Sequence, residues 1–207
     1  GLRLADYVVT EAGFGADLGA EKFIDIKCRS AGIRPSAGVL VATIRAIKFH
    51  GGAAREDLSE ENLPALRAGL ANLNRHINNL RENYGVPAVV SINQFVADTD
   101  AEVELVMEHC KALGVQVALS SHWANGGAGA TDLAHMVAEI CDADTTPANT
   151  PHNSFVYPGE LSLWEKLEAV ATKVYHASEI TASSKVRDRL KELTDGGYGH
   201  LPVCIAK

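Results

Sequence analysis

Short apolar runs alternate with amphipathic segments along most of the chain, and this alternation is the main indication of its fold. An unbroken apolar run is typical of a strand that is buried on both faces, as in a parallel sheet covered by helices. The pattern therefore predicts an α/β fold with a mostly parallel sheet and flanking helices. The predicted strands are residues 7–10, 38–44, 88–92, 115–120 and 201–207.

The amphipathic segments predict the helices. Between residues 62 and 85, leucines and other apolar residues recur at alternating steps of three and four, which places them on one face of a helix. Thr99 and Glu102 have the spacing of a capping box, so a helix is predicted to begin there and to reach about Gly114. Further helices are predicted near residues 131–141, 162–176 and 183–194.

Residues 143–160 contain three prolines and little periodicity, so they are predicted to be a linker or an excursion from the fold. This division leaves an α/β portion at residues 1–142 and a helical segment at residues 161–207 that ends in a core strand. Because the chain stops inside that predicted strand with no polar tail, we expect a fold that is incomplete at both ends.

Composition and charge exclude several classes of protein. Hydrophobic residues make up 46% of the chain and charged residues 22%, which is typical of a globular protein. The net charge of −7 argues against nucleic-acid binding, and no apolar stretch approaches the roughly 18 residues of a membrane span. The four scattered cysteines favour a cytoplasmic location, and a mitochondrial or plastid one stays open if a transit peptide lies upstream. The eight histidines lack zinc-ligand spacing, so no metal site is predicted.

A glycine-rich motif, GFGADLG at residues 13–19, follows the first predicted strand. Glycines after a strand let backbone amides approach phosphate oxygens, and the flanking Glu11 and Asp17 could hold a magnesium ion. The alternative is a tight turn in which a surface acid caps a helix. The spacing is not that of a dinucleotide-binding loop, and the second predicted strand leads into Arg45 instead of an acid, which argues against a nicotinamide-linked dehydrogenase.

Two further clusters follow predicted strands. Arg45, Lys48 and His50 come directly after the strand at 38–44, where cations are well placed to meet phosphate or carboxylate; the alternative is solvated charges on a loop. Asn93 and Phe95 come after the next strand, where an amide can read a purine or pterin edge and an aromatic ring can stack on a flat ligand. The alternative for Phe95 is a core plug beside a capping loop.

Taken together, several long segments resemble the formate–tetrahydrofolate ligases. The most specific is VATIRAIKFHGG at residues 41–52, in which Ile47 stands where leucine is usual. In the expected order it is joined by VVTEAGFGADLGAEKF, INQFVADTDAE, HWANGGAGATDLA and GYGHLPVCIAK, the last with His200 where asparagine is usual. The resemblance covers nearly the whole chain and is loosest around residues 53–59 and 142–158.

The resemblance implies a P-loop NTPase-like fold, of which residues 1–142 would be part of the nucleotide- and folate-binding region. It implies an enzyme that uses ATP to phosphorylate formate and then transfers the formyl group from formyl phosphate to tetrahydrofolate. Magnesium with ATP, a monovalent cation such as potassium or ammonium as activator, and a homodimer or homotetramer are also implied, without a bound redox cofactor.

Site residues follow from the resemblance position by position. Phe95 matches an aromatic residue that stacks at the ligand's ring, with Asn93 as a polar neighbour. Leu201 and Pro202 match an apolar wall of the same pocket. The remaining candidates lie in strongly patterned segments and are predicted to be catalytic without a defined role: Glu11, Asp17, Arg45 and Lys48.

No Walker A loop occurs in the 207 residues, whereas the family has one upstream of this region. We therefore expect the chain alone to be inactive as a ligase. The alternative function is a non-catalytic α/β scaffold or a segment for subunit contacts.

Overall fold

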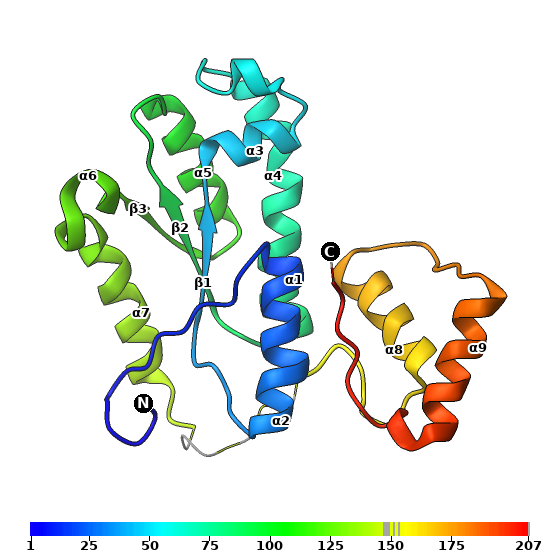
Figure 1. The fold of residues 1–207 in the computed structure, drawn as a ribbon. Helices are drawn as coiled ribbons and strands as arrows, with labels where there is room; N and C mark the ends of the chain where they lie inside the picture. Colours follow the sequence, from blue (N-terminus) through cyan, green and yellow to red (C-terminus); the bar gives the residue numbers. More distant parts are fainter. Residues whose placement is uncertain (147–149, 151, 153, 207) are drawn as a thin grey trace. The chain divides into compact units, whose positions relative to one another are not determined.

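A parallel sheet forms from three of the predicted strands, in the order β1-β2-β3 (Figure 1). In the register of the sheet, Leu40 lies opposite Val90, and Ser91 lies opposite Ala118. The predicted α/β fold with a parallel sheet and flanking helices is therefore confirmed. The strands are β1 at Gly38–Ala42, β2 at Ala88–Asn93 and β3 at Gln116–Ser120. This computed structural model describes residues 1–146, 150, 152 and 154–206.

Helices connect and flank these strands. The helices predicted at 62–85, 99–114 and 131–141 are confirmed. The second of them begins with the predicted capping box. The Glu102 amide donates to the Thr99 hydroxyl at 3.3 Å, and the Thr99 amide donates to the Glu102 carboxylate at 3.2 Å. The elements are α3 at Ile44–His50, a 3-10 turn at Arg55–Asp57, α4 at Leu63–Asn78 with a π-helical end at Asn79–Asn83, α5 at Asp100–Ala112, α6 at His122–Asn125, a 3-10 helix at Gly126–Ala130 and α7 at Thr131–Ala143.

The core of this part lies around the central strand. Val89, Val90 and Ile92 of β2 are fully buried, as are Leu66 and Ile77 on the apolar face of α4. Helix α4 contacts β1 and α5, α5 contacts β3, and α7 contacts β2 and β3. Burial of each large aliphatic side chain contributes about 1.5–3 kcal/mol, so the amphipathic face of α4 is a main reason for its position.

Two predicted strands are wrong. Residues 7–10 form no strand in the described structure, and Val9 is 91% exposed. Residues 201–206 are likewise irregular, although Val203 is buried. An apolar run indicates that side chains avoid water but not that a neighbouring strand is present to pair with them.

The alternative of solvated charges on a loop at residues 45–50 is also wrong, because helix α3 begins almost directly after β1. Thr43 caps it by accepting a hydrogen bond from the Ala46 amide at 3.1 Å. Arg45, Lys48 and His50 therefore lie on a helix. Because Thr43 directly follows β1 and also caps α3, no loop separates the strand from the helix.

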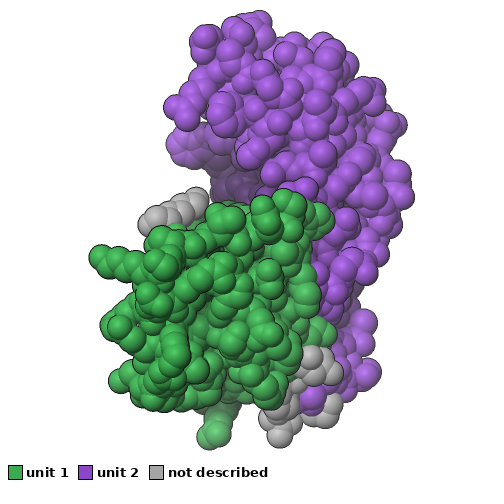
Figure 2. Space-filling model, turned by 90° about the vertical axis from the view of Figure 1, so that its right-hand side faces the viewer, with its two compact units in different colours: residues 1–34, 151–207 green, residues 35–150 purple. Residues whose placement is uncertain are grey.

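By its contacts the chain divides into two units, residues 35–150 and residues 1–34 with 151–207, which Figure 2 colours separately. In the second unit the helices predicted near 162–176 and 183–194 are confirmed. Its elements are α1 at Ala16–Glu21, a π-helical segment at Lys22–Cys28, α2 at Arg29–Ala31, α8 at Leu163–Ala169 with a π-helical end at Val170–Val174, and α9 at Ser184–Leu193 with a π-helical end at Thr194–Tyr198. No helix among the described residues is long and apolar enough to cross a membrane.

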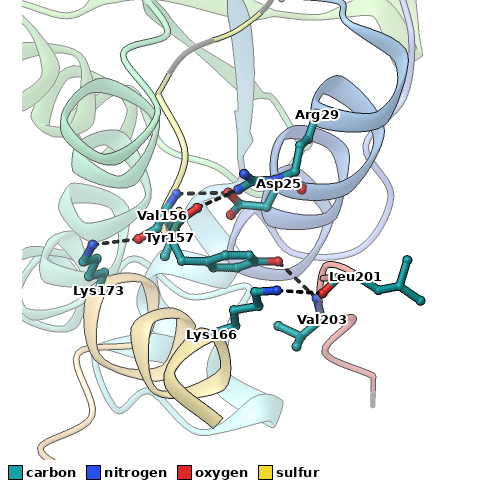
Figure 3. A network of polar contacts seen from close by, with 8 residues as sticks. All are labelled: Asp25, Arg29, Val156, Tyr157, Lys166, Lys173, Leu201 and Val203. Atoms are coloured by element: carbon teal, nitrogen blue, oxygen red, sulfur yellow. Dashed lines mark hydrogen bonds and ion pairs between the residues drawn. The ribbon is translucent and has the colours of Figure 1, made fainter. Parts of the chain in front are cut away.

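A polar network holds the second unit together (Figure 3). The Asp25 carboxylate accepts from the Val156 amide at 3.0 Å, Arg29 donates to the Tyr157 carbonyl at 2.7 Å, and Lys173 donates to the Val156 carbonyl at 2.6 Å. Val156 and Tyr157 are each only 1% exposed, so the segment that contains them packs against the helices at residues 22–31.

This network changes the predicted division into 1–142, 143–160 and 161–207. Residues 1–34 belong with residues 151–207, and the later part of the predicted linker is an internal part of that unit. Proline content marked the segment as irregular, whereas the burial of Val156 and Tyr157 shows that its later part is packed. Residues 147–149, 151 and 153 of the predicted linker lie outside the described residues.

Glu21, at the end of α1, is a buried carboxyl group in the same unit. Its side chain is fully buried, and neither oxygen accepts a hydrogen bond from any described residue. Burial, with a smaller contribution from the nearby Asp25 charge, raises the pKa of Glu21 from 4.5 to about 7. The neutral acid is therefore the form that the folded unit favours.

We expect Glu21→Gln to remove a pH dependence of stability. The raised pKa favours folding below pH 4.5, and this contribution is lost as the pH rises to about 7, with a difference on the order of 3 kcal/mol. The variant should be more stable than the unsubstituted protein at pH 8, and its urea midpoint should fall less between pH 5 and pH 8. The exposed Glu168→Gln serves as control, and equal pH profiles for all three proteins would contradict the assignment.

Candidate functional site

An open groove with a volume of about 480 Å³ lies at the carboxyl ends of β1 and β2. Three segments form it: α3 with its capping residue, the turn after α3, and the loop after β2. Its lining residues are Thr43, Arg45, Ala46, Phe49, Arg55, Leu58 and Phe95. In open α/β sheets this edge is where ligands bind, and the groove brings together two of the predicted residues, Arg45 and Phe95.

Each arginine of the groove lies over an aromatic ring. The Arg45 guanidinium carbon is 5.7 Å from the centre of the Phe95 ring, and that of Arg55 is 5.5 Å from the centre of the Phe49 ring. In the described part of the chain, neither guanidinium forms an ion pair. The groove therefore offers positive charge beside flat apolar surfaces.

Phe95 is held by its own loop. Its amide donates to the Asp98 carboxylate at 2.8 Å, and the side chain is 36% exposed. Burial raises the pKa of Asp98 despite that hydrogen bond. The alternative of a core plug is thus not what this structure has, because one part of the ring faces the groove.

Asn93, at the end of β2, is half-buried beside the groove but does not line it. Its side-chain oxygen accepts from the Ser91 hydroxyl at 3.3 Å. This bond orients the amide group and leaves a further role of Asn93 as a prediction.

Lys48 lies in the core and not in the groove. Its ammonium is 2.8 Å from the Glu102 carboxylate, and the two side chains are 1% and 0% exposed. The same ammonium donates to the Glu60 carbonyl at 2.8 Å. The predicted contact of Lys48 with a ligand is absent in this arrangement, in which the charge is neutralised inside the fold.

Glu102 is the centre of this buried cluster. One of its oxygens also accepts from the Asn62 amide at 3.0 Å, while the other belongs to the capping box at Thr99. Burial alone would raise the pKa of Glu102, but these hydrogen bonds and the Lys48 charge outweigh burial and lower it. The pair therefore contributes stability above about pH 4.5, and this contribution is lost as the pH falls through the lowered pKa.

The glycine-rich motif lies in the unit of residues 1–34 and 151–207. A side chain on Gly19 would collide with the carbonyl groups of Ala12 and Gly13, so the motif is a tight turn packed onto α1. Glu11 is exposed, and Asp17 is half-buried with its carbonyl 3.5 Å from the Tyr175 hydroxyl. Among the described residues no three histidine, cysteine or acidic side chains gather to hold a metal ion.

Leu201 and Pro202 lie in the same unit as this motif. Buried Lys166 donates to the Leu201 carbonyl at 3.0 Å, and the Tyr157 hydroxyl accepts from the Val203 amide at 3.2 Å (Figure 3). Lys166 also donates to the Gly199 carbonyl at 2.8 Å, so it fixes the backbone of this segment. The Leu201 side chain is 43% exposed, which leaves its predicted role in an apolar wall untested.

Three residues with features of ligand contacts were missed from the sequence. Phe14 has a backbone φ of 70° and a side chain that is 80% exposed, and Trp123 is 77% exposed. A phenylalanine at positive φ carries strain of about 1–3 kcal/mol, which folds retain mainly at functional sites. A phenylalanine between glycines was the available signal. No sequence signal indicated Arg55, because its place in the groove depends on the contact with Phe49.

A smaller groove of about 200 Å³ lies between α8 and α9. The Arg187 guanidinium carbon is 4.0 Å from the Trp164 ring, and Lys191 pairs with Asp195 at 2.6 Å. None of the predicted site residues lines this groove.

The parallel sheet with its flanking helices defines an α/β protein, and comparison with known proteins gives the family. The family model of formate–tetrahydrofolate ligase matches residues 1–207. Relatives of that name are 59% identical in Methylococcus capsulatus, 55% in Granulibacter bethesdensis and 52% in Sinorhizobium fredii. These alignments cover 100% of this chain and 36%, 35% and 36% of the relatives.

The chain therefore belongs to the formate–tetrahydrofolate ligase family, as the sequence segments indicated. It spans about 36% of the length of the curated relatives it matches.

We expect Lys48→Met to destabilise the protein by about 3–5 kcal/mol, because it leaves the Glu102 charge buried without its partner. In Lys48→Met/Glu102→Gln both charges are gone, and glutamine can still complete the capping box. The double variant should be more stable than Lys48→Met alone when urea midpoints are compared at pH 7. If the loss of stability in the double variant equals the sum of the losses in Lys48→Met and Glu102→Gln, the two residues are not coupled.

Proposed function

We propose that the protein containing this chain is an ATP-dependent formate–tetrahydrofolate ligase that forms 10-formyltetrahydrofolate. The observation that carries the proposal is the family match over the whole chain, with relatives of that name at up to 59% identity. Formate is a poor acyl donor, so ATP first converts it to formyl phosphate, whose phosphate is a good leaving group for attack by an amine of tetrahydrofolate. The protein's task is to position the reactants and to stabilise negative charge.

Within this scheme, the groove beside β1 and β2 is the proposed contact for a flat ring. Phe95 offers part of its ring face, Arg45 places positive charge beside it, and Asn93 is the polar neighbour. Leu201 with Pro202, and Glu11 with Asp17, stay as proposed contacts of substrate. Lys48 acts by holding the groove together through Glu102.

Further parts of the proposal concern the whole protein. Magnesium enters with ATP, whose phosphates supply part of its ligands. A monovalent cation acts as activator, and the protein works as a homodimer or homotetramer. Because the chain spans 36% of the curated relatives, we propose that catalysis requires residues outside it.

The reaction is tested by measuring formate- and tetrahydrofolate-dependent release of ADP. We expect turnover by the full product of the gene and none by the 207-residue chain. Turnover by the short chain would refute its proposed inactivity. A full-length product that releases no ADP would instead favour a non-catalytic scaffold or subunit-contact role.

We expect Phe95→Ala in the full-length protein to raise the KM for tetrahydrofolate roughly two- to tenfold, because a stacking surface is lost. The KM for formate should stay the same. Val96→Ala is the matched control, since Val96 is fully exposed and does not line the groove. An unchanged KM in Phe95→Ala, with activity intact, would remove Phe95 from the site.

A further inference from the structure

Strand β1 is an outer strand of the sheet, and its free edge carries exposed apolar side chains. Within the part of the chain that the structure describes, β1 pairs only with β2. Val39 and Val41 of β1 lie opposite Val89 and Ser91 in the register. Val89 and Ser91 are 0% and 1% exposed, whereas Val39 and Val41 are 43% and 58% exposed. One face of the sheet is therefore covered over β2 but open over β1.

The backbone of the same two valines points away from β2. The Gly38 amide donates to the Pro87 carbonyl at 2.8 Å, so Gly38 directs its backbone towards the β2 side. In a parallel pair, every second residue of a strand directs its amide and carbonyl to one neighbour, and the residues between direct theirs to the other side. Leu40 therefore faces β2 as Gly38 does, and Val39 and Val41 present their amides and carbonyls at the free edge.

The composition of β1 is that of an interior strand. An edge strand that faces water usually carries a charged side chain, a proline or a bulge, which prevents pairing with another strand. The sequence of β1, GVLVA, contains no charge and no proline, and its register with β2 advances one residue at a time without a bulge. Interior strands of parallel sheets are apolar in this way because both of their faces are buried.

The free edge and the length of the relatives together indicate what covers β1. Backbone amides and carbonyls at a sheet edge are paired best by another strand, since a helix uses its own backbone groups internally. The chain spans about 36% of the length of its curated relatives, so most of the length of those proteins lies outside the segment that they share with it. A strand of the same polypeptide meets the edge at a much higher effective concentration than a second copy does.

We propose that the free edge of β1 binds a further apolar strand from the part of the same polypeptide that lies outside residues 1–207. That strand pairs with the amides and carbonyls of Val39 and Val41. Its side chains on the open face pack against the two valines, as β-branched and aromatic residues do across paired strands. Strand β1 then becomes an interior strand, as its composition requires.

Hydrogen exchange of the full-length protein, measured at single residues, tests the pairing. The amides of Val39 and Val41 are expected to exchange at least about a hundredfold more slowly than in an unstructured peptide, as the Leu40 amide does. Exchange of both valines near the rate of an unstructured peptide, with Leu40 protected, would overturn the proposal. Protection that disappears when the protein is diluted to monomers would assign the edge to a second copy and would overturn it as well.

Substitution tests the open face separately. Val41→Lys in the full-length protein should lower the urea midpoint, because it places a charge where the added strand covers the side chain. Val41→Ile stays apolar and should change the midpoint much less. Val96→Lys is the matched control, since Val96 is fully exposed in a loop. Equal midpoints for Val41→Lys and Val96→Lys would show that the face is open in the whole protein, and the proposal would fail. Neither measurement involves turnover, so both results stand whether or not the protein is a ligase.

Discussion

The buried ion pair between Lys48 and Glu102 joins three segments that local sequence preferences would not bring together. Lys48 lies on α3, Glu102 on α5, and their hydrogen bonds reach the backbone at Glu60 and Asn62 between them. Removal of either charge leaves the other in a medium where a lone ion is costly, so the three segments keep one mutual arrangement.

The same three segments form the groove. Arg45 and Phe49 lie on α3. Arg55 lies in the segment that also contains the Glu60 carbonyl, and Phe95 lies in the loop between β2 and the capping box at Thr99. The positions of the exposed donors and rings are therefore set by charges that touch no ligand. A site of this kind separates the residues that bind from those that define its shape, and both types can appear in one short motif.

The sequence pattern predicted the sheet and the helices α4, α5 and α7 because local signals there agree with tertiary packing. Strand β2 is an unbroken apolar run, and the Thr99 capping box is complete within four residues. The run at residues 7–10 has the same character but finds no partner strand, which depends on distant chain. For the site, Arg45 and Phe95 could be predicted from their places after strands, whereas the burial of Lys48 depends on Glu102, which no local pattern reveals.

The hydrogen bond between Asp25 and the Val156 amide spans 131 positions of sequence, and this separation has a consequence for the order of folding. Residues 35–150 are continuous in the chain, so their sheet can form as soon as they have left the ribosome. Residues 1–34 are synthesised before residues 35–150 but lack the partners of Asp25 and Arg29 until residues 156 and 157 emerge. Until then the hydrogen bonds of Asp25 and Arg29 to these two residues cannot form, so residues 1–34 reach their final packing only after a much later part of the chain has been made.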